Sequence, residues 1–119
     1  ASPMDPWTSN YIFPGAYLPA LHEITYEMGK AGFSILDVEN LRLHYAKTLD
    51  KWAENFEKNI DKIRELYGEA FIRRWRLFLN SASAGFKYGT TRLFQILFSK
   101  GLNNALPITR AHMYHNNHP

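Results

Sequence analysis

The stretch LRLHYAKTLDKWAENFEKNIDKIRELY, residues 41–67, repeats large apolar side chains at a helical period. Successive members lie three or four residues apart, which places them along one side of an α-helix. They are Tyr45, Leu49, Trp52, Phe56, Ile60, Ile63 and Tyr67. Charged residues fill most of the positions between them. The stretch therefore predicts one long amphipathic helix on a protein surface, with one face covered.

A second stretch, residues 69–87, shows the same period directly after Gly68. Because the junction between the two stretches is so short, they predict a hairpin-like pair of helices. The apolar stripe of the second helix comprises Phe71, Trp75, Phe78, Ala82 and Phe86, and Ile72 and Leu79 widen it.

The flanking residues predict shorter elements. Residues 1–18 read as an ordered loop with a turn at Pro14-Gly15. A helix is expected from Pro19 to a stop at Gly29 or Gly32, without an N-capping side chain at Ala20. GFSILDVENL (32–41) and TRLFQILF (91–98) are rich in strand-forming residues, so each predicts a strand.

Composition excludes several classes of protein. A chain of 119 residues with 45% hydrophobic and 21% charged residues has the makeup of one small globular domain. The absence of cysteine rules out disulfides, thiolate zinc sites and a cysteine nucleophile. No apolar run approaches the roughly 20 residues that span a bilayer, and no signal peptide opens the chain, so a soluble cytoplasmic protein is expected.

Charge is distributed unevenly along the chain. All eleven acidic residues lie at or before Glu69, whereas seven basic residues and no acid follow it. The second half is therefore expected to attract anions, and charge alone leaves phospholipid headgroups, nucleic acid and a merely solvated face as alternatives. The seven bases are Arg73, Arg74, Arg76, Lys87, Arg92, Lys100 and Arg110.

The segment HYAKTLDKW (44–52) resembles the hYxxTLxxW element of the cyclopropane-fatty-acyl-phospholipid synthases and the related mycolic acid methyltransferases. DPWTSNYIFPGAYLPAL (5–21), WRLFLNSASAGF (75–86) and LFQILFSKG (93–101) resemble the same family in the same order, so the likeness covers residues 5–110. It departs from the family at Ala16, Ala20 and Ala82, where relatives often carry glycine, serine and cysteine.

The resemblance implies an α/β fold, the C-terminal part of a Rossmann-like S-adenosylmethionine-dependent methyltransferase, mostly helical with two antiparallel strands. In that fold 35–38 would pair with 93–97. Residues 1–110 would form the methyltransferase portion, including a helical hairpin lid, and 111–119 a mobile tail. The family's enzymes are much longer, and this chain resembles their C-terminal third.

The resemblance also implies a reaction. In such enzymes the double bond of an unsaturated phospholipid acyl chain attacks the sulfonium methyl of S-adenosylmethionine, and bicarbonate removes a proton from the resulting cation so that a cyclopropane ring closes. The family binds the cofactor through a glycine-rich segment that this sequence lacks, so no cofactor-binding residue is expected here and the chain alone is expected to be inactive. The expected location is peripheral, at the inner membrane surface. The expected partners are the lipid and either the upstream core of the same enzyme or a second copy, with no nucleic acid.

Tyr45 is the one catalytic residue that the resemblance implies, as a ligand of bicarbonate beside a histidine and a glutamate of the upstream core. Read from the residues alone, Tyr45 is a helix-face aromatic with its hydroxyl at the rim. The aromatics of both helices are likewise either core packing or the lining of an acyl-chain channel. His22 and His44 are expected to be surface or structural residues.

The residues also allow a metal site and a non-enzymatic function to be considered. His112, His115 and His118 follow an H-x2-H-x2-H spacing, but Asn116, Asn117 and Pro119 disfavour the helix that would align them, so no metal site is predicted. The alternatives to an enzyme are a basic nucleic-acid module, disfavoured because its bases are spread out, and a non-catalytic fragment or lipid- or protein-binding helical module that retains the family fold.

Overall fold

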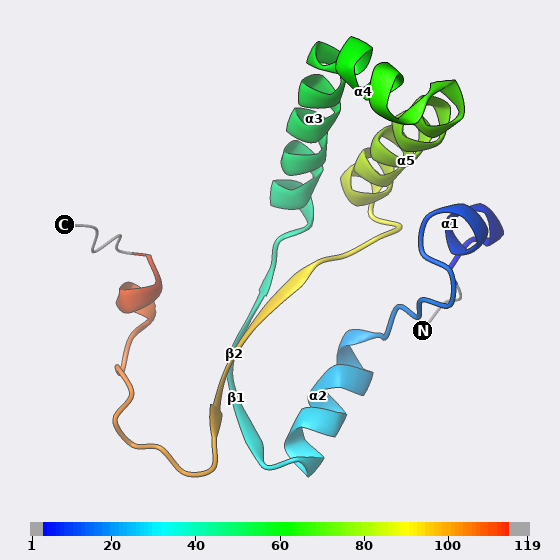
Figure 1. The fold of residues 1–119 in the computed structure, drawn as a ribbon. Helices are drawn as coiled ribbons and strands as arrows, with labels where there is room; N and C mark the ends of the chain where they lie inside the picture. Colours follow the sequence, from blue (N-terminus) through cyan, green and yellow to red (C-terminus); the bar gives the residue numbers. More distant parts are fainter. Residues whose placement is uncertain (1–3, 115–119) are drawn as a thin grey trace.

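The computed structural model describes residues 4–114 (Figure 1). A two-stranded ribbon carries a helical hairpin at one end, and α4 joins the two long helices at the hairpin's tip (Figure 1). The elements run in the order α1 (Pro6–Tyr11), α2 (Leu21–Lys30), β1 (Phe33–Asn40), α3 (Arg42–Lys58), α4 (Ile60–Tyr67), α5 (Glu69–Tyr88), β2 (Phe94–Lys100) and a 3-10 helix, η1 (Arg110–Met113).

The ribbon confirms the predicted antiparallel pairing of the two strands, although 35–38 lie opposite 96–98 and not opposite the predicted 93–97. β1 and β2 are antiparallel, with Ile35 opposite Phe98 and Val38 opposite Ile96. A β-bulge at Leu36, between Ile35 and Asp37, shifts the register by one residue. Side chains alternate between the faces of a strand, so without the bulge Ile35 and Val38 would point to opposite faces. The bulge places both on the face of Phe98 and Ile96.

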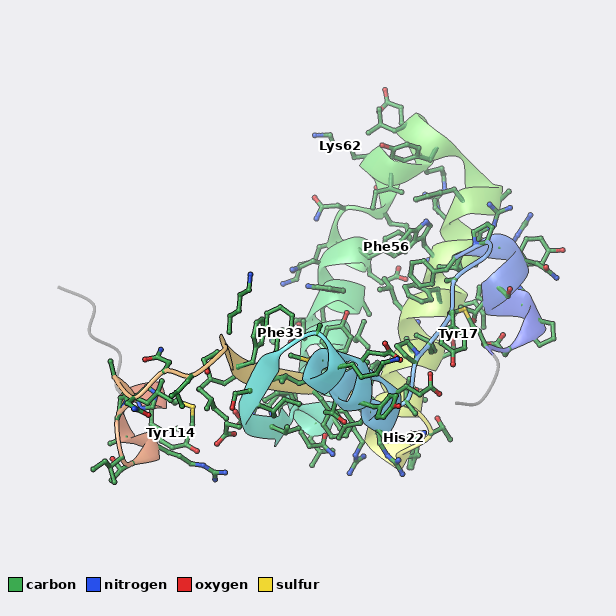
Figure 2. The ribbon with its side chains drawn as sticks, turned by 90° about the horizontal axis from the view of Figure 1, so that it is seen from below. Tyr17, His22, Phe33, Phe56, Lys62 and Tyr114 are labelled. Carbon is green, nitrogen blue, oxygen red and sulfur yellow. The ribbon has the colours of Figure 1, made fainter. Side chains whose placement is uncertain are left out.

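The hairpin core lies between α3 and α5, as the apolar periods predicted. Leu49 is 1% exposed and packs with Ala46, Leu79 and Phe86. Figure 2 shows Phe56 between the same two helices, where it packs against this cluster. The predicted stripe is displaced on α3, however, because Trp52 is 47% exposed. The buried line runs through Ala46 and Leu49, which leaves Trp52 at its edge.

The prediction of one continuous helix over 41–67 was wrong, because the helix is interrupted at Asn59. Asn59 has φ −110° and ψ 18°, and its side-chain Nδ2 donates to the carbonyl oxygen of Asn55 at 2.8 Å. A side-chain bond of this kind competes with the helical backbone pattern, and asparagine is a weak helix former. The chain bends there, and α4 packs against α5.

The prediction of an ordered loop over 1–18 was wrong for residues 6–11. Residues 6–11 form α1, whose N-cap Asp5 accepts a hydrogen bond from the Thr8 backbone nitrogen at 2.9 Å. Pro6 occupies the first helical position, where its missing N–H costs nothing. An Asp-Pro pair is thus a helix-start signal as well as a turn signal.

The predicted turn at Pro14-Gly15 is confirmed. The backbone nitrogen of Ala16 donates to the carbonyl oxygen of Phe13 at 3.2 Å, and Gly15 has φ +74°. A positive φ at this third position of the turn requires glycine or asparagine. No strain falls on Ala16, since the positive φ belongs to the residue before it.

α2 begins without a side-chain cap, as its sequence predicted. Ala20 has the extended backbone of an N-cap residue, and the Glu23 backbone nitrogen donates to the Ala20 carbonyl oxygen at 3.0 Å.

Replacing Ala20 by serine is expected to raise the free energy of unfolding by about 0.5–1 kcal/mol, because the hydroxyl would accept from a free N–H of the first turn. Urea denaturation followed by circular dichroism measures this, with Ala20→Val as the control that cannot cap. Equal midpoints for the serine and valine variants would contradict the prediction.

The chain as a whole is extended. Its radius of gyration is 18.6 Å, whereas a compact domain of this length has about 13.5 Å. The ribbon and the hairpin therefore do not close around one shared core, although α2 packs beside β1.

The C-terminal segment folds back to the ribbon through an ion pair between Arg110 and Asp37 at 2.5 Å. Figure 2 shows Tyr114 at the far end of this segment. The predicted tail, residues 111–119, begins within η1 and extends beyond the described residues, so its mobility stays a prediction.

Candidate functional site

The α3–α5 hairpin has two edges of opposite chemistry. We call the first the aromatic seam: Tyr45 and Trp52 of α3 with Trp75, Phe78 and Phe86 of α5. We call the second the polar seam: Asp50 and Glu57 of α3 with Arg76, Ser83 and Lys87 of α5. The core described above lies between the two seams. A ligand at the hairpin would therefore meet rings on one edge and charges on the other.

Tyr45 lies in the aromatic seam, half-buried between two other rings. Its ring centroid is 4.8 Å from that of Phe86 and 5.9 Å from that of Trp52, and both contacts are edge-to-face. Such pairs favour one ring orientation. Within residues 4–114 no hydrogen bond to the Tyr45 hydroxyl is present. The packing fixes the ring while leaving the hydroxyl available to a polar ligand.

The aromatic seam continues as a line of rings that begins at the end of α4 and runs along α5. Centroid distances are 4.7 Å from Tyr67 to Phe71, 5.7 Å from Phe71 to Trp75 and 5.3 Å from Trp75 to Phe78. The line ends on Phe13, whose centroid is 5.6 Å from that of Phe78 and which attaches the segment after α1 to the hairpin. The arrangement contributes packing and also offers an apolar track to a long-chain ligand.

The polar seam links the helices through two carboxylates. The Arg76 guanidinium donates through Nε and Nη2 to the two oxygens of Glu57, at 2.7 and 3.0 Å. Asp50 accepts from the Ser83 hydroxyl at 2.5 Å and lies 2.9 Å from Lys87 Nζ. The hydrogen bond from Arg76 lowers the pKa of Glu57, and those from Ser83 and then Lys87 lower the pKa of Asp50.

An open groove of about 740 Å³ follows the polar seam. The charged groups of the polar seam itself already satisfy one another, so the seam reads as structural. Ser83 accordingly is 4% exposed although it is polar. The groove is lined by Asp50, Ala53, Glu54, Phe56, Glu57, Lys58, Arg76, Leu79, Asn80 and Lys87.

These ion pairs show that only some of the seven bases of the second half lack an acidic neighbour, and whether the second half attracts anions stays a prediction. Arg76, Lys87 and Arg110 are paired with acids of the first half. Antiparallel packing of α3 on α5 brings Glu57 and Asp50 beside Arg76 and Lys87, and the C-terminal segment brings Arg110 to Asp37 on β1. Within residues 4–114, Arg73, Arg74, Arg92 and Lys100 have no carboxylate partner, and Arg74 lies over the Tyr11 ring at 5.6 Å.

The lowered pKa of Glu57 predicts that the fold loses stability in acid. A carboxylate with a lowered pKa stabilises the fold above its ordinary value, here 4.5, and that stability is lost as pH falls through the lowered pKa. Thermal melting from pH 7 to pH 3 is expected to show a loss below about pH 4.5 that shrinks in Glu57→Gln. Glu65→Gln, an exposed change on α4, is the control and should keep the full loss. An unchanged pH dependence in Glu57→Gln would show that the Arg76 pair contributes nothing.

The tail histidines form no site in the part of the chain that is described. His112 Nδ1 lies 3.1 Å from the carbonyl oxygen of Thr109, and His115 and His118 lie outside the described residues. Residues 4–114 hold no group of three potential metal ligands. None of their helices combines the length and apolar content needed to cross a bilayer.

Comparison with known proteins places these features in a family context. The sequence profile described as mycolic acid cyclopropane synthetase matches residues 2–96. A probable fatty acid methyltransferase of Pseudomonas putida is 43% identical over 107 residues, which make up 87% of this chain and 27% of that protein. The cyclopropane-fatty-acyl-phospholipid synthase of Escherichia coli K12 is 33% identical over 107 residues, 90% of this chain and 28% of that protein.

A solved structure has the same arrangement of elements. The mycolic acid cyclopropane synthase CmaA1, complexed with SAH and CTAB, superposes with a TM-score of 0.76 at 29% identity, over 79% of this chain and 33% of that one. The chain therefore spans between 27% and 33% of the length of these proteins.

Proposed function

Since this chain belongs to the mycolic acid cyclopropane synthetase family, we propose that it forms part of an S-adenosylmethionine-dependent methyltransferase acting on unsaturated phospholipid acyl chains, with a cyclopropane fatty acid as product. Its fold is the C-terminal part of that Rossmann-like methyltransferase fold. The observation that carries the proposal is the Tyr45 hydroxyl, held by two ring contacts and left without a partner within residues 4–114.

Tyr45 fits a small oxyanion such as bicarbonate. A phenol donates one hydrogen bond, and a bond to a charged acceptor is stronger than one between neutral groups. Bound bicarbonate supplies the proton acceptor of the reaction. Tyr45 would hold one of its oxygens, while Trp52 and Phe86 keep water from that side. The remaining ligands would come from outside this chain.

The methyl donor, S-adenosylmethionine, would be bound by the rest of the enzyme. The chain has no glycine-rich strand–turn–helix to cradle a nucleotide, so we assign no cofactor contact to it. Its proposed contribution is the lipid side. The line of rings from Tyr67 to Phe78 would pack along the acyl chain and direct its double bond toward Tyr45.

The ribbon would join the chain to its partner. A two-stranded ribbon is marginally stable alone, and its outer edges carry unpaired backbone groups. Leu36, Val38, Leu97 and Phe98 on this ribbon are also more than a third exposed. We propose that further strands of the methyltransferase core cover these groups, and that without the core the chain self-associates.

A chimera tests the proposed function. The matching 107 residues of the Pseudomonas putida relative would be replaced by this chain, which is 43% identical over that region. The chimera is expected to transfer labelled methyl groups from S-adenosylmethionine to vesicles of unsaturated phospholipid, and a truncation lacking the region serves as the control. A folded chimera that binds the cofactor but labels no lipid would favour a non-catalytic role.

Vesicle binding tests the proposed peripheral location. Arg73 and Arg74 lack carboxylate partners and lie beside Leu77, which is 52% exposed. Replacing both by glutamine is expected to weaken binding to anionic vesicles about 30-fold at low salt, since each base near such a surface contributes about 1 kcal/mol. The double variant Arg76→Gln with Glu57→Gln is the control, because it removes one charge of each sign from an ion pair and leaves the net charge unchanged. Equal losses of binding in the test variant and the control variant, or equal binding to neutral vesicles, would exclude the Arg73 and Arg74 surface as the membrane-binding site.

A further inference from the structure

The first turn of α3 is bonded to the last turn of α5 by one side chain, Arg42. Its Nη1 donates to the carbonyl oxygens of Phe86 and Lys87, at 2.7 and 2.8 Å. These are carbonyls of the helix end, which have no partner inside the helix, and a cation is favoured there by the helix dipole. Arg42 is half-buried, so solvent does not fully screen the interaction.

We propose that Arg42 is a positioning residue for Tyr45: its bonds to the end of α5 hold the Phe86 ring against the Tyr45 ring and so set where the Tyr45 hydroxyl points. The inference rests on the proposed function for Tyr45. It adds a residue that makes no contact with the hydroxyl and acts through the backbone of α5.

Arg42 and Tyr45 lie within one turn of α3, and both contact Phe86 of α5. Arg42 and Tyr45 are three residues apart on α3 and therefore lie on adjoining positions of one face. Phe86 provides both the carbonyl that Arg42 binds and the ring that lies 4.8 Å from Tyr45. If the Arg42 bonds are lost, the last turn of α5 can shift locally against the first turn of α3, and the edge-to-face contact weakens with that shift.

The ribbon fixes both ends of this link. The Arg42 backbone nitrogen donates to Asn40 Oδ1 at 2.9 Å, and the Leu41 nitrogen to the Leu93 carbonyl oxygen at 2.8 Å. On the other side, a Cβ on Gly85 would lie 2.6 Å from Thr91 Oγ1, so the end of α5 sits directly on the segment leading to β2. Arg42 thus joins two helix ends that are each already anchored.

The link is distinct from the polar seam. Asp50 also joins α3 to Lys87, but it lies two turns further along α3 and on the opposite edge of the core from Tyr45. Loss of Asp50 should loosen the hairpin without turning the Tyr45 ring. Asp50→Asn is therefore the control for a general loss of stability.

Fluorine NMR of the chimera labelled with 3-fluorotyrosine provides the test, with the Tyr45 signal assigned by its absence in Tyr45→Phe. Arg42→Gln is expected to shift or broaden the Tyr45 signal. Arg42→Lys should restore much of it, because one ammonium nitrogen can donate to both carbonyls. Asp50→Asn and Lys47→Gln, an exposed change on α3, should leave it in place. An unmoved signal in Arg42→Gln, or an equal shift in Asp50→Asn, overturns the inference.

Turnover in the chimera separates this inference from the proposed function. Arg42→Gln is expected to lower kcat about tenfold with an unchanged KM for lipid, which corresponds to about 1.4 kcal/mol. If Tyr45→Phe loses turnover while the Tyr45 signal ignores Arg42, the positioning role fails alone. If Tyr45→Phe keeps full turnover, the proposed role of Tyr45 fails and the inference with it, while a chimera that labels no lipid fails the proposed function itself.

A second variant covers the case in which Arg42→Gln does not fold. Phe86→Leu removes the ring but leaves the backbone carbonyl that Arg42 binds. It is expected to shift the Tyr45 signal, and an unmoved signal would overturn the route through Phe86.

Discussion

Replacing Leu49 by alanine is expected to lower the free energy of unfolding by about 2–5 kcal/mol, the cost of emptying a fully packed apolar site. Leu49 is 1% exposed and packs with Ala46, Leu79 and Phe86 at the centre of the hairpin core. Neighbouring side chains are tied across both seams, so they cannot easily collapse into the space. The loss is large beside the 5–15 kcal/mol stability of a typical domain.

Urea denaturation of the chain, followed by circular dichroism, measures this loss. Leu77→Ala is the matched control, since it makes the same chemical change on the same hairpin at a side chain that is 52% exposed. The control should cost no more than about 0.5 kcal/mol. Similar midpoints for the two variants would mean that the hairpin core contributes little to stability in this extended chain.

The apolar period of the sequence was enough to predict the hairpin, because burying one stripe per helix leaves few other ways to pair α3 with α5. Antiparallel strand pairing followed from the family resemblance and is confirmed, but the partners of 35–38 are 96–98 and not the predicted 93–97. The bulge at Leu36 had a visible signal as well. Ile35 and Leu36 are adjacent apolar residues in an otherwise alternating strand, and an extra residue keeps Ile35 and Val38 on one face.

The errors in the helices came from single polar residues. Asn59 stands among good helix formers, and its side-chain bond to the Asn55 carbonyl decides where the helix ends. Asp5-Pro6 was read as loop chemistry although it also begins helices. In each case a local hydrogen bond worth about 1 kcal/mol selects between two backbones of similar energy, and a period of apolar residues carries no record of it.

The seams were beyond a reading of the sequence, since they depend on how α3 and α5 are aligned. Glu57 and Arg76 are nineteen residues apart, and Asp50 and Ser83 thirty-three. The sequence correctly predicts that the second half carries an excess of basic residues. Which of those bases lack a carboxylate partner is known only once the helices are aligned. The sequence gives no signal for the role of Arg42 either, because its partners are backbone carbonyls of α5.

Replacing Tyr45 by phenylalanine is expected to lower turnover of the complete enzyme by roughly ten- to a hundredfold while leaving its folding intact. The phenylalanine ring keeps both edge-to-face contacts, with Phe86 and Trp52, and no hydrogen bond within residues 4–114 is lost. What disappears is one bond to a charged ligand, worth about 1.5–3 kcal/mol, and each 1.4 kcal/mol of lost transition-state stabilisation is about tenfold in rate.

Bicarbonate distinguishes this effect from a packing defect. Ring formation on phospholipid vesicles would be followed in the chimera as bicarbonate is varied, and Tyr45→Phe should need more bicarbonate as well as turning over more slowly. Tyr88→Phe, the same change at a side chain that is 84% exposed, should match the wild type. If Tyr45→Phe retains both the wild-type turnover and the wild-type bicarbonate dependence, then Tyr45 is a packing residue of the aromatic seam, and the proton acceptor must be held entirely by groups outside this chain.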